Sequence, residues 1–316
     1  MIDRFHSIEL VAAREARVTV FYRDLLGLEL LARDGEAGAG GSGSGEVRLR
    51  FGSNGGEPGT LVTVRVRPGA GRGRWGVGGV HHVALGVATQ AAQLMWKRRL
   101  EDAGVVVTGP YDRRWFEGIY FTDPDGQVVE IATAGPGYGV DEPLDALGQV
   151  VVDPGEERLR GNRDEAGIRA RTHPDPVPEV TSAMALRGIH HITGLTDGAA
   201  RAEDFYGALG LRVVKRTVNQ DDGETPHIFW ARYDGEEVGP HSAWTLFEWK
   251  GSDYRARPGT GQTERVLFHA PDAEALEAVR DRLLGMGVEV SAMPGSATGV
   301  RFRAPDGQPL GVVTGT

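Results

Sequence analysis

Hydrophobic and polar residues alternate along two stretches of the chain, residues 80–85 and 128–132, with a helix-like segment and a turn between them. Such alternation is typical of half-buried strands, in which neighbouring side chains point to opposite faces. The first stretch carries the histidine pair His81 and His82, and the second carries a single carboxylate, Glu130. Because a buried charge is costly without a partner, Glu130 is a candidate ligand for a metal ion.

The same pattern returns in the second part of the chain. The strand with His6 and the helix with Phe21 correspond, at one constant offset, to a strand with His190 and a helix with Phe205. The turn Pro-Asp-Gly-Gln at 124–127 likewise recurs at 305–308. We therefore interpret the two halves as duplicates of each other.

Each half divides again into two units, each with a strand, a helix and further strands. The predicted first half covers 1–147, with units 1–68 and 79–134, and the second covers 186–316, with units 186–250 and 264–316. Helices are predicted over 89–103 and 272–284. The proline-rich residues 148–185 lack a sustained period, which predicts a linker or tail over the surface.

Composition limits the possible functions. The chain has 316 residues, 40% of them hydrophobic and 25% charged, which is typical of a soluble globular protein. It shows neither a membrane-length apolar run nor a leader pattern, so we expect a cytoplasmic protein without membrane contact. The net charge of -9 disfavours nucleic acid and favours a small-molecule partner. Without cysteine, only His, Asp and Glu remain as metal ligands.

Comparison of the four units tests the ligand hypothesis. The second position of the histidine pair is Ser7 in the first unit, His82 in the second and His191 in the third, and the fourth unit has no pair. The position of Glu130 is occupied by Gly311 in the fourth unit. Architecture alone would not explain these differences. Two imidazoles and one carboxylate suit a divalent metal with open positions, as in non-haem Fe(II) oxygenases.

These ligands also predict how the units pair. Strands in separate cores cannot share a metal, so we expect the second and third units to build the metal-bearing barrel and the first and fourth to build the other. The nitrogens of His82 and His191 should then lie within about 5 Å of each other, since each imidazole binds a common ion at roughly 2.0 to 2.1 Å.

Several motifs resemble the vicinal oxygen chelate superfamily, which includes glyoxalase I, bleomycin-resistance proteins and type I extradiol dioxygenases. These motifs are the Phe-Tyr helix end that runs into Leu-Gly-Leu, at 205–211, and the Pro-Asp-Gly turn before Glu130. The resemblance implies an α+β fold, in which four βαβββ units form two barrel-like domains.

A closer resemblance is to the hydroquinone-type ring-cleaving dioxygenases. It rests on GIHHIT at 188–193, VKRTVN at 214–219 and RRWFEGIYF at 113–121. In that family the half with the GIHHIT strand comes first, so this chain is similar to a circular permutation of it. Permutation is tolerated where termini lie close together at the surface.

The closer resemblance implies particular roles for named residues. The metal ligands would be His82, His191 and Glu130, with Fe(II) as the metal and Mn(II) as the alternative. Five further positions match the surroundings of the family's metal: His81, His190, Thr193, Arg113 and Tyr120. The implied reaction is ring cleavage of a hydroquinone-type or catecholic substrate with O2.

Residue chemistry suggests what some of these groups would do. Coordination lowers the pKa of a phenol, so His81 or His190 could accept a proton that the metal has already loosened. Tyr120 could donate a hydrogen bond to the bound oxygen, and Arg113 could stabilise negative charge.

Other functions stay open. A glyoxalase-like isomerase or lyase on Zn, Ni or Co would favour a fourth ligand, for which Glu248 is the candidate. A metal-free, aromatic-binding resistance protein would have no use for the three ligands together. We interpret the single histidines His227, His241 and His269 as structural or exposed. Four aromatic residues could line a ring pocket or belong to the core: Trp115, Phe116, Phe229 and Trp230. A homo-oligomer is also left open.

Overall fold

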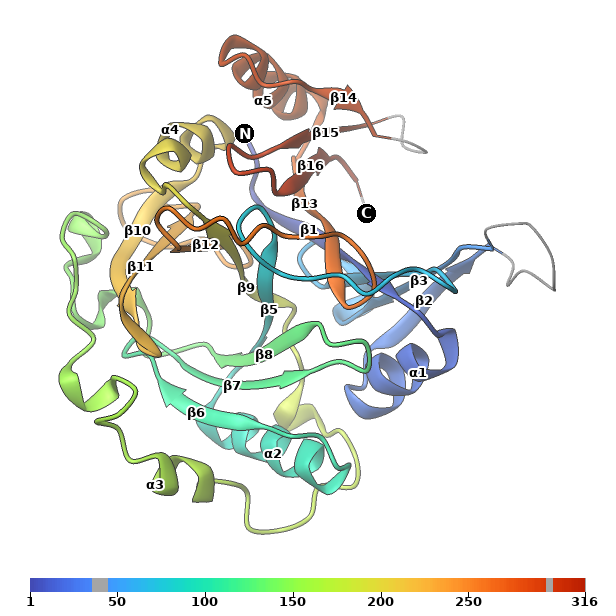
Figure 1. Ribbon diagram of the computed structural model, residues 1–316, viewed down its shortest axis with the longest axis vertical. Coiled ribbons are helices and arrows are strands. Elements are labelled where there is room, and N and C mark those ends of the chain that lie inside the picture. Colours follow the sequence, from blue (N-terminus) through green and yellow to red (C-terminus); the bar gives the residue numbers. More distant parts are fainter. Residues whose placement is uncertain (36–44, 294–297, 316) are drawn as a thin grey trace.

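The computed structural model describes residues 1–35, 45–293 and 298–315 (Figure 1). Each of the four sequence units forms a strand, a helix and three further strands. The first unit comprises β1 (Arg4–Ala12), α1 (Glu15–Thr19) with the π-helical turn η1 (Val20–Leu25), β2 (Glu29–Asp34), β3 (Val47–Gly52) and β4 (Leu61–Val66). The second comprises β5 (Val80–Val87), α2 (Gln90–Asp102), β6 (Thr108–Asp112), β7 (Glu117–Thr122) and β8 (Val128–Thr133).

The other two units repeat this order. The third comprises β9 (Ile189–Thr196), α4 (Ala200–Leu209), β10 (Arg212–Asn219), β11 (Asp222–Ala231) and β12 (Ala243–Glu248). The fourth comprises β13 (Gln262–His269), α5 (Ala273–Gly285), β14 (Ser291–Ala292), β15 (Gly299–Arg303) and β16 (Pro309–Val313). The α+β fold of four βαβββ units is confirmed.

The strands form two curled eight-stranded sheets. One has the order β10-β11-β12-β9-β5-β8-β7-β6, and the other has the order β14-β15-β16-β13-β1-β4-β3-β2. Each sheet is joined at its centre by an antiparallel pair, β5 with β9 and β1 with β13. The second unit therefore pairs with the third and the first with the fourth, as the ligand pattern predicted. We call the sheet of the second and third units the metal barrel and the other the second barrel.

The predicted helices over 89–103 and 272–284 form because each begins at a residue that caps it. Thr89 Oγ1 accepts a hydrogen bond from the Ala92 backbone N–H at the start of α2, and Asp272 caps α5 in the same way. Trp96 and Leu100 of α2 are fully buried against the metal barrel. The helices thus cover the outside of each sheet (Figure 1). None in the described chain is long and apolar enough to cross a membrane.

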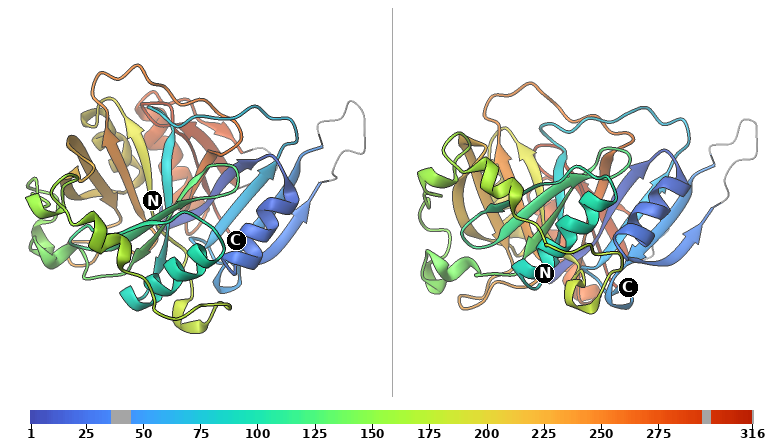
Figure 2. Two further views of the ribbon diagram at one scale, coloured as in Figure 1. Left: turned by 60° about the horizontal axis from the view of Figure 1, so that its bottom comes forward. Right: turned by 90° about the horizontal axis from the view of Figure 1, so that it is seen from below.

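Two connections hold the barrels together at one end of the molecule. Residues 69–78 join the first two units, and residues 251–261 join the last two. They run side by side in both views of Figure 2, and isolated bridges link Arg74 to Arg257 and Val77 to Arg255. Each connection therefore runs from one barrel to the other.

Residues 148–185 wrap the outside of the metal barrel. The Val152 N–H donates to the Arg216 carbonyl on the edge strand β10. The helix α3 (Glu165–Ala170) lies beside β6, the edge strand at the opposite end of the sheet. Lys97 of α2 ties α3 to the barrel, since its ammonium donates to the carbonyls of Arg169 and Arg171. Covering an edge strand removes a template for unwanted pairing.

Candidate metal centre

Three side chains from three neighbouring strands of the metal barrel meet at one point. The Nε2 atoms of His82 and His191 lie 3.2 Å apart, which confirms the predicted proximity. Oε2 of Glu130 lies 3.1 Å from His82 Nε2 and 3.2 Å from His191 Nε2. The strand register explains the meeting, because Ala84 on β5 is opposite both His191 on β9 and Glu130 on β8. His82 lies two residues from Ala84 and shares its face of the sheet.

The charge of Glu130 is not satisfied by the protein. Its side chain is fully buried, and within the described residues neither oxygen accepts a well-formed hydrogen bond, so its close contacts are those with the two histidine nitrogens. Burial raises the pKa of Glu130, but the adjacent His191 and His82 outweigh it and hold that pKa well below its usual value. A buried, unpaired carboxylate beside two imidazoles calls for a cation.

The donor set fits a divalent metal. In the part of the chain that the structure describes, these three residues are the only group of three or more His, Asp or Glu side chains placed to hold one. Two neutral imidazoles and a carboxylate suit Fe(II), Mn(II) or Zn(II).

The paired histidines orient the ligand rings. Nδ1 of His82 lies 2.8 Å from Nδ1 of His81, and the same distance separates His191 from His190. With Nε2 turned to a cation, each ligand ring carries its proton on Nδ1 and donates it to the preceding histidine. Burial, with the neighbouring ligand histidine, lowers the pKa of both His81 and His190 to about 3, so both are neutral acceptors at pH 7.

A small cavity of about 20 Å³ lies against the ligands. Its walls combine the two ligand histidines with polar and aromatic side chains: Arg113, Trp115, Phe116, Tyr120, Thr217, Val218, Gln220, His227, Phe229 and Phe247. A cavity needs roughly 10 to 15 Å³ of such volume to hold one water, so this cavity has room for a water molecule but not for an aromatic ring. An aromatic ring therefore enters only if some of these side chains move.

A hydrogen-bonded chain closes one side of this cavity. Arg113 donates to the Tyr120 hydroxyl at 3.2 Å and to Gln220 Oε1 at 2.7 Å. Gln220 in turn donates from Nε2 to the Asp112 carbonyl at 2.9 Å. The structure thus brings Arg113 and Tyr120 to the cavity, while His81 and His190 lie behind the ligand rings.

From the sequence, His227 is predicted to be structural or exposed, like the other single histidines. The structure instead puts His227 on the cavity wall, with Nε2 2.9 Å from Thr245 Oγ1. His241 and His269 do lie elsewhere, beside the Ile189 carbonyl and the Asp3 carboxylate. A signal for His227 existed, because it stands two residues before Phe229 on one strand and so shares its face.

Three of the four expected aromatic residues line the cavity, namely Trp115, Phe116 and Phe229. The fourth, Trp230, points to the opposite face, where its ring packs 5.3 Å from Tyr206 in the core. Alternation along β11 separates Phe229 from Trp230.

The position of a fourth ligand is occupied by Thr245. Thr245 on β12 is opposite Thr193 of β9, just as Glu130 on β8 is opposite Ala84 of β5. Thr245 therefore stands in the third unit where Glu130 stands in the second. Thr245 Oγ1 lies 2.7 Å from Thr193 Oγ1, which in turn lies 3.0 Å from His82 Nε2. Glu248 is not at the centre, because it accepts a hydrogen bond from the Ala199 N–H. The centre therefore offers three protein ligands.

Gly118 on β7 makes room for the ligand carboxylate. A Cβ atom at this position would overlap Oε1 of Glu130, and it would lie 3.0 Å from Cδ of Glu130 and 3.0 Å from the Tyr120 hydroxyl oxygen. Sequence reasoning missed Gly118, although a glycine inside a strand often marks such a close approach.

A match to a superfamily profile shows which protein superfamily the chain belongs to. The profile of the Glyoxalase/Bleomycin resistance protein/Dioxygenase superfamily matches residues 4–131 and 188–310. The chain belongs to this superfamily. Both matched segments contain a histidine of the candidate metal centre, and the first also contains Glu130.

Three proteins of Bacillus subtilis (strain 168) are similar in sequence, each named "Putative ring-cleaving dioxygenase". MhqO is 28% identical over 167 residues, 53% of this chain and 49% of the relative. MhqA is 41% identical over 83 residues, 26% of each chain, and MhqE is 32% identical over 133 residues, 41% of this chain and 42% of the relative. The chain thus spans half or less of the length of these relatives.

Solved structures share the fold over nearly the whole chain. A "putative dioxygenase" from Bacillus subtilis subsp. subtilis str. 168 has a TM-score of 0.73 at 21% identity, covering 99% of this chain and 85% of that one. Glyoxalase I from Zea mays has a TM-score of 0.61 at 15% identity, covering 98% and 92%. At these identities the likeness establishes the fold alone.

Proposed function

We propose that this superfamily member is an Fe(II)-dependent ring-cleaving dioxygenase that acts with O2 on hydroquinone-type aromatic substrates. The observation that carries the proposal is the three-ligand centre with Thr245 at the fourth position. A glyoxalase-like enzyme would favour a carboxylate there, whereas O2 and a substrate oxygen need open positions. The names of the Bacillus subtilis relatives support the same reaction class.

Iron held by His82, His191 and Glu130 would supply adjacent positions for a substrate oxygen and O2, and would lower the pKa of a phenolic hydroxyl. Bringing both reactants to one place replaces a difficult encounter with a neighbouring-group reaction. The protein contributes the orientation of the ring and the handling of its protons and charge.

Tyr120 and Arg113 are placed to act on the substrate oxygen. Burial raises the pKa of Tyr120, more than Arg113 lowers it, so the phenol keeps its proton at neutral pH. Arg113 donates to the Tyr120 oxygen, which leaves the Tyr120 proton for an acceptor in the site. Glu130 is beside the hydroxyl and also raises the pKa of Tyr120, so the donated hydrogen bond would pass from Glu130 to the substrate oxygen when Glu130 holds a metal. Arg113 also brings positive charge to a buried site, where negative charge that develops on the substrate is strongly stabilised.

His227 is the uncoordinated histidine on the cavity wall. Burial lowers its pKa well below the usual value, so the ring is neutral at pH 7 but is a weak base, which would accept a proton only from a hydroxyl whose own pKa a metal has lowered. We assign the acceptance of the substrate proton to His227, and the orientation of the ligand rings to His81 and His190.

A hydroquinone presents one oxygen to the metal, whereas a catechol can chelate through two. An enzyme for hydroquinones must therefore fix the ring with its own side chains. Arg113, Tyr120 and His227 provide polar contacts, and Trp115 and Phe229 provide apolar walls.

Oxygen consumption tests the proposal. The metal-free protein is loaded anaerobically with Fe(II) or, in parallel, with Zn(II), and is then mixed with oxygenated hydroquinone and catechol of matched substitution. We expect O2 uptake only with iron, and faster with the hydroquinone. A clear preference for catechol would assign the protein to the ordinary extradiol group. No uptake with full iron loading would refute dioxygenase activity and favour the glyoxalase-like alternative.

A further inference from the structure

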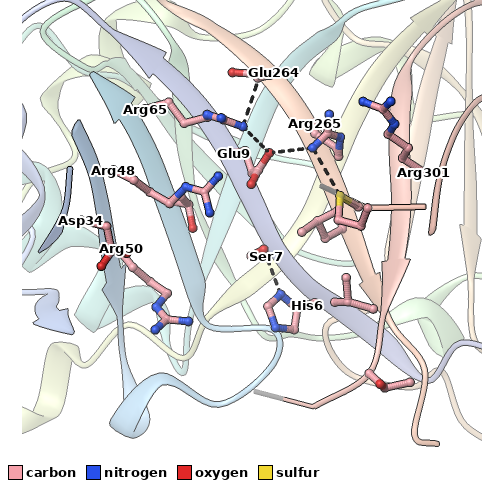
Figure 3. A pocket seen from close by; sticks show the side chains of 15 residues that line it. His6, Ser7, Glu9, Asp34, Arg48, Arg50, Arg65, Glu264, Arg265 and Arg301 are labelled. Carbon is pink, nitrogen blue, oxygen red and sulfur yellow. Dashed lines mark hydrogen bonds and ion pairs between the residues drawn. The ribbon is translucent and has the colours of Figure 1, made fainter. Parts of the chain in front are cut away.

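We propose that the second barrel binds a small organic anion, a carboxylate or phosphate ester with a short apolar body, in a cavity on its concave face. The cavity measures about 470 Å³ and lies between β3, β1, β13 and β15 (Figure 3). This volume is typical of sites for small molecules. The inference concerns the barrel without the metal and does not depend on the proposed oxygenase activity.

The cavity is the duplicated counterpart of the metal centre. In the second barrel, Glu9 is opposite Arg265 and Leu267 is opposite Gly311. The equivalent pairs in the metal barrel are Thr193 with His82 and Ala84 with Glu130. Arg265 therefore stands in place of His82 and Gly311 in place of Glu130. The concave site is kept, but its metal ligands are replaced.

Positive charge dominates the replaced site. Five arginines line the cavity against three carboxylates: Arg48, Arg50, Arg65, Arg265 and Arg301 against Glu9, Asp34 and Glu264. His6 adds no charge, because burial and the neighbouring His269 lower its pKa to about 4. A pocket with excess positive charge attracts anions from solution.

Three of these guanidinium groups are free to bind a ligand. Glu9 accepts a hydrogen bond from Arg265 at 3.2 Å, and Arg65 pairs with Glu46 at 2.7 Å. By contrast, Arg48, Arg50 and Arg301 make no hydrogen bond or ion pair with any described residue, and Figure 3 shows them on opposite walls of the cavity. A guanidinium presents a planar fork of donors that matches carboxylate and phosphate oxygens.

The strand register adds an independent observation. Arg48 on β3 is directly opposite Arg65 on β4, with Arg50 two residues along on the same face. Asp34 on β2 is opposite Arg48 on its other side. Arg65 is paired with Glu46, Glu9 and Glu264, whereas the partner of Arg50 across the strands is the neutral Thr63. An anion beside Arg50 would accept charge-assisted hydrogen bonds from its guanidinium.

An apolar patch at one side of the cavity defines the rest of the ligand. Leu267, Met293 and Val313 form a small buried cluster, and all three line the cavity. An inorganic ion would leave this wall in contact with water. A ligand with a short hydrocarbon or ring body would cover it and so remove apolar surface from water, which is favourable.

The test uses three probes that share a phenyl ring, on the metal-loaded protein of this sequence. Benzoate, phenyl phosphate and the neutral benzamide are titrated by calorimetry. We expect at least one anion to bind and benzamide not to bind, with affinity falling as salt rises from about 50 to about 500 mM. Tighter binding of benzoate would identify a carboxylate ligand, and tighter binding of phenyl phosphate would identify a phosphate ester.

Variants locate the binding. Arg50→Gln and Arg301→Gln should each weaken the anion at least about tenfold, because each removes a charged donor. Both side chains are exposed, so the fold should survive, which circular dichroism checks. The control Arg282→Gln changes an exposed arginine on α5 and should leave affinity unchanged.

Anions can also bind at a metal, so binding at the metal centre must be distinguished from binding in the second barrel. The variant Glu130→Gln should lose the metal but keep its affinity for the anion. Loss of binding in Glu130→Gln together with full binding in Arg50→Gln would place the anion at the metal centre and overturn the proposal. Equal binding of benzamide, or no binding of either anion, would overturn it as well.

Discussion

Gly118→Ala should weaken metal binding without changing any ligand. A methyl group at this position would lie 3.0 Å from Cδ of Glu130, whereas ordinary contacts between carbon atoms are about 3.5 to 4.0 Å. It would lie equally close to the Tyr120 hydroxyl oxygen. Oε1 of Glu130 would be closer still, so the carboxylate must shift by on the order of one ångström from its place beside the two imidazoles.

The expected loss of metal affinity in Gly118→Ala follows from how strictly a metal site depends on the placement of its ligands. Changes to residues that hold a ligand in position cost about 10- to 100-fold in metal affinity. This corresponds to about 1 to 3 kcal/mol, at 1.4 kcal/mol per factor of ten. The fold should survive, because the methyl meets a side-chain carboxylate and a hydroxyl rather than rigid backbone.

Competition with a chelator under anaerobic conditions would measure Fe(II) affinity, and thermal unfolding of the metal-free protein would report the fold. The control is Gly207→Ala on α4, where a new Cβ meets no atom within 4 Å and metal affinity should be unchanged. If Gly118→Ala bound iron as tightly as the unchanged protein, the close packing of Glu130 against β7 would not hold the ligand in place.

Other outcomes follow from single groups. Glu130→Gln should keep the fold but lose the metal at ordinary concentrations, since it removes the only anionic ligand. Metal analysis and unfolding curves would be measured together, and a variant that unfolds before it loses the metal would show that Glu130 is structural. Tyr120→Phe should lower kcat more than it raises KM, because the hydroxyl acts on charge that develops during reaction. A rise in KM alone would assign the Tyr120 hydroxyl to substrate binding. Burial lowers the pKa of His6 to about 4, below its ordinary 6.5, so the unfolded chain binds a proton that the native chain does not. The free energy of unfolding should thus fall as pH drops from about 6.5 to about 4, and His6→Gln should flatten this slope in urea titrations of the metal-free protein, while an unchanged slope would contradict the assignment.

The sequence by itself determined the candidate ligands and the pairing of the units. The four repeats share one strand register, so a difference between repeats at a single position, such as His82 against Ser7 or Glu130 against Gly311, is visible without any structure. A metal needs its ligands on a common face, which restricts the second unit to pairing with the third. These conclusions rest on local periodicity and on the chemistry of residue types, both of which a sequence contains.

Only the tertiary structure decided which other side chains surround the ligands. Thr245 stands at the position that a fourth ligand would need, and His227 reaches the cavity from a different strand, because sheet register brings together residues with no regular spacing in sequence. Gly118 matters only through its distance to Glu130 on the adjacent strand. The free arginines of the second barrel likewise become a site only when β3 and β15 face each other across one cavity. Contacts between distant strands depend on how the sheets curl and pack, and that geometry arises from the whole chain rather than from any one segment.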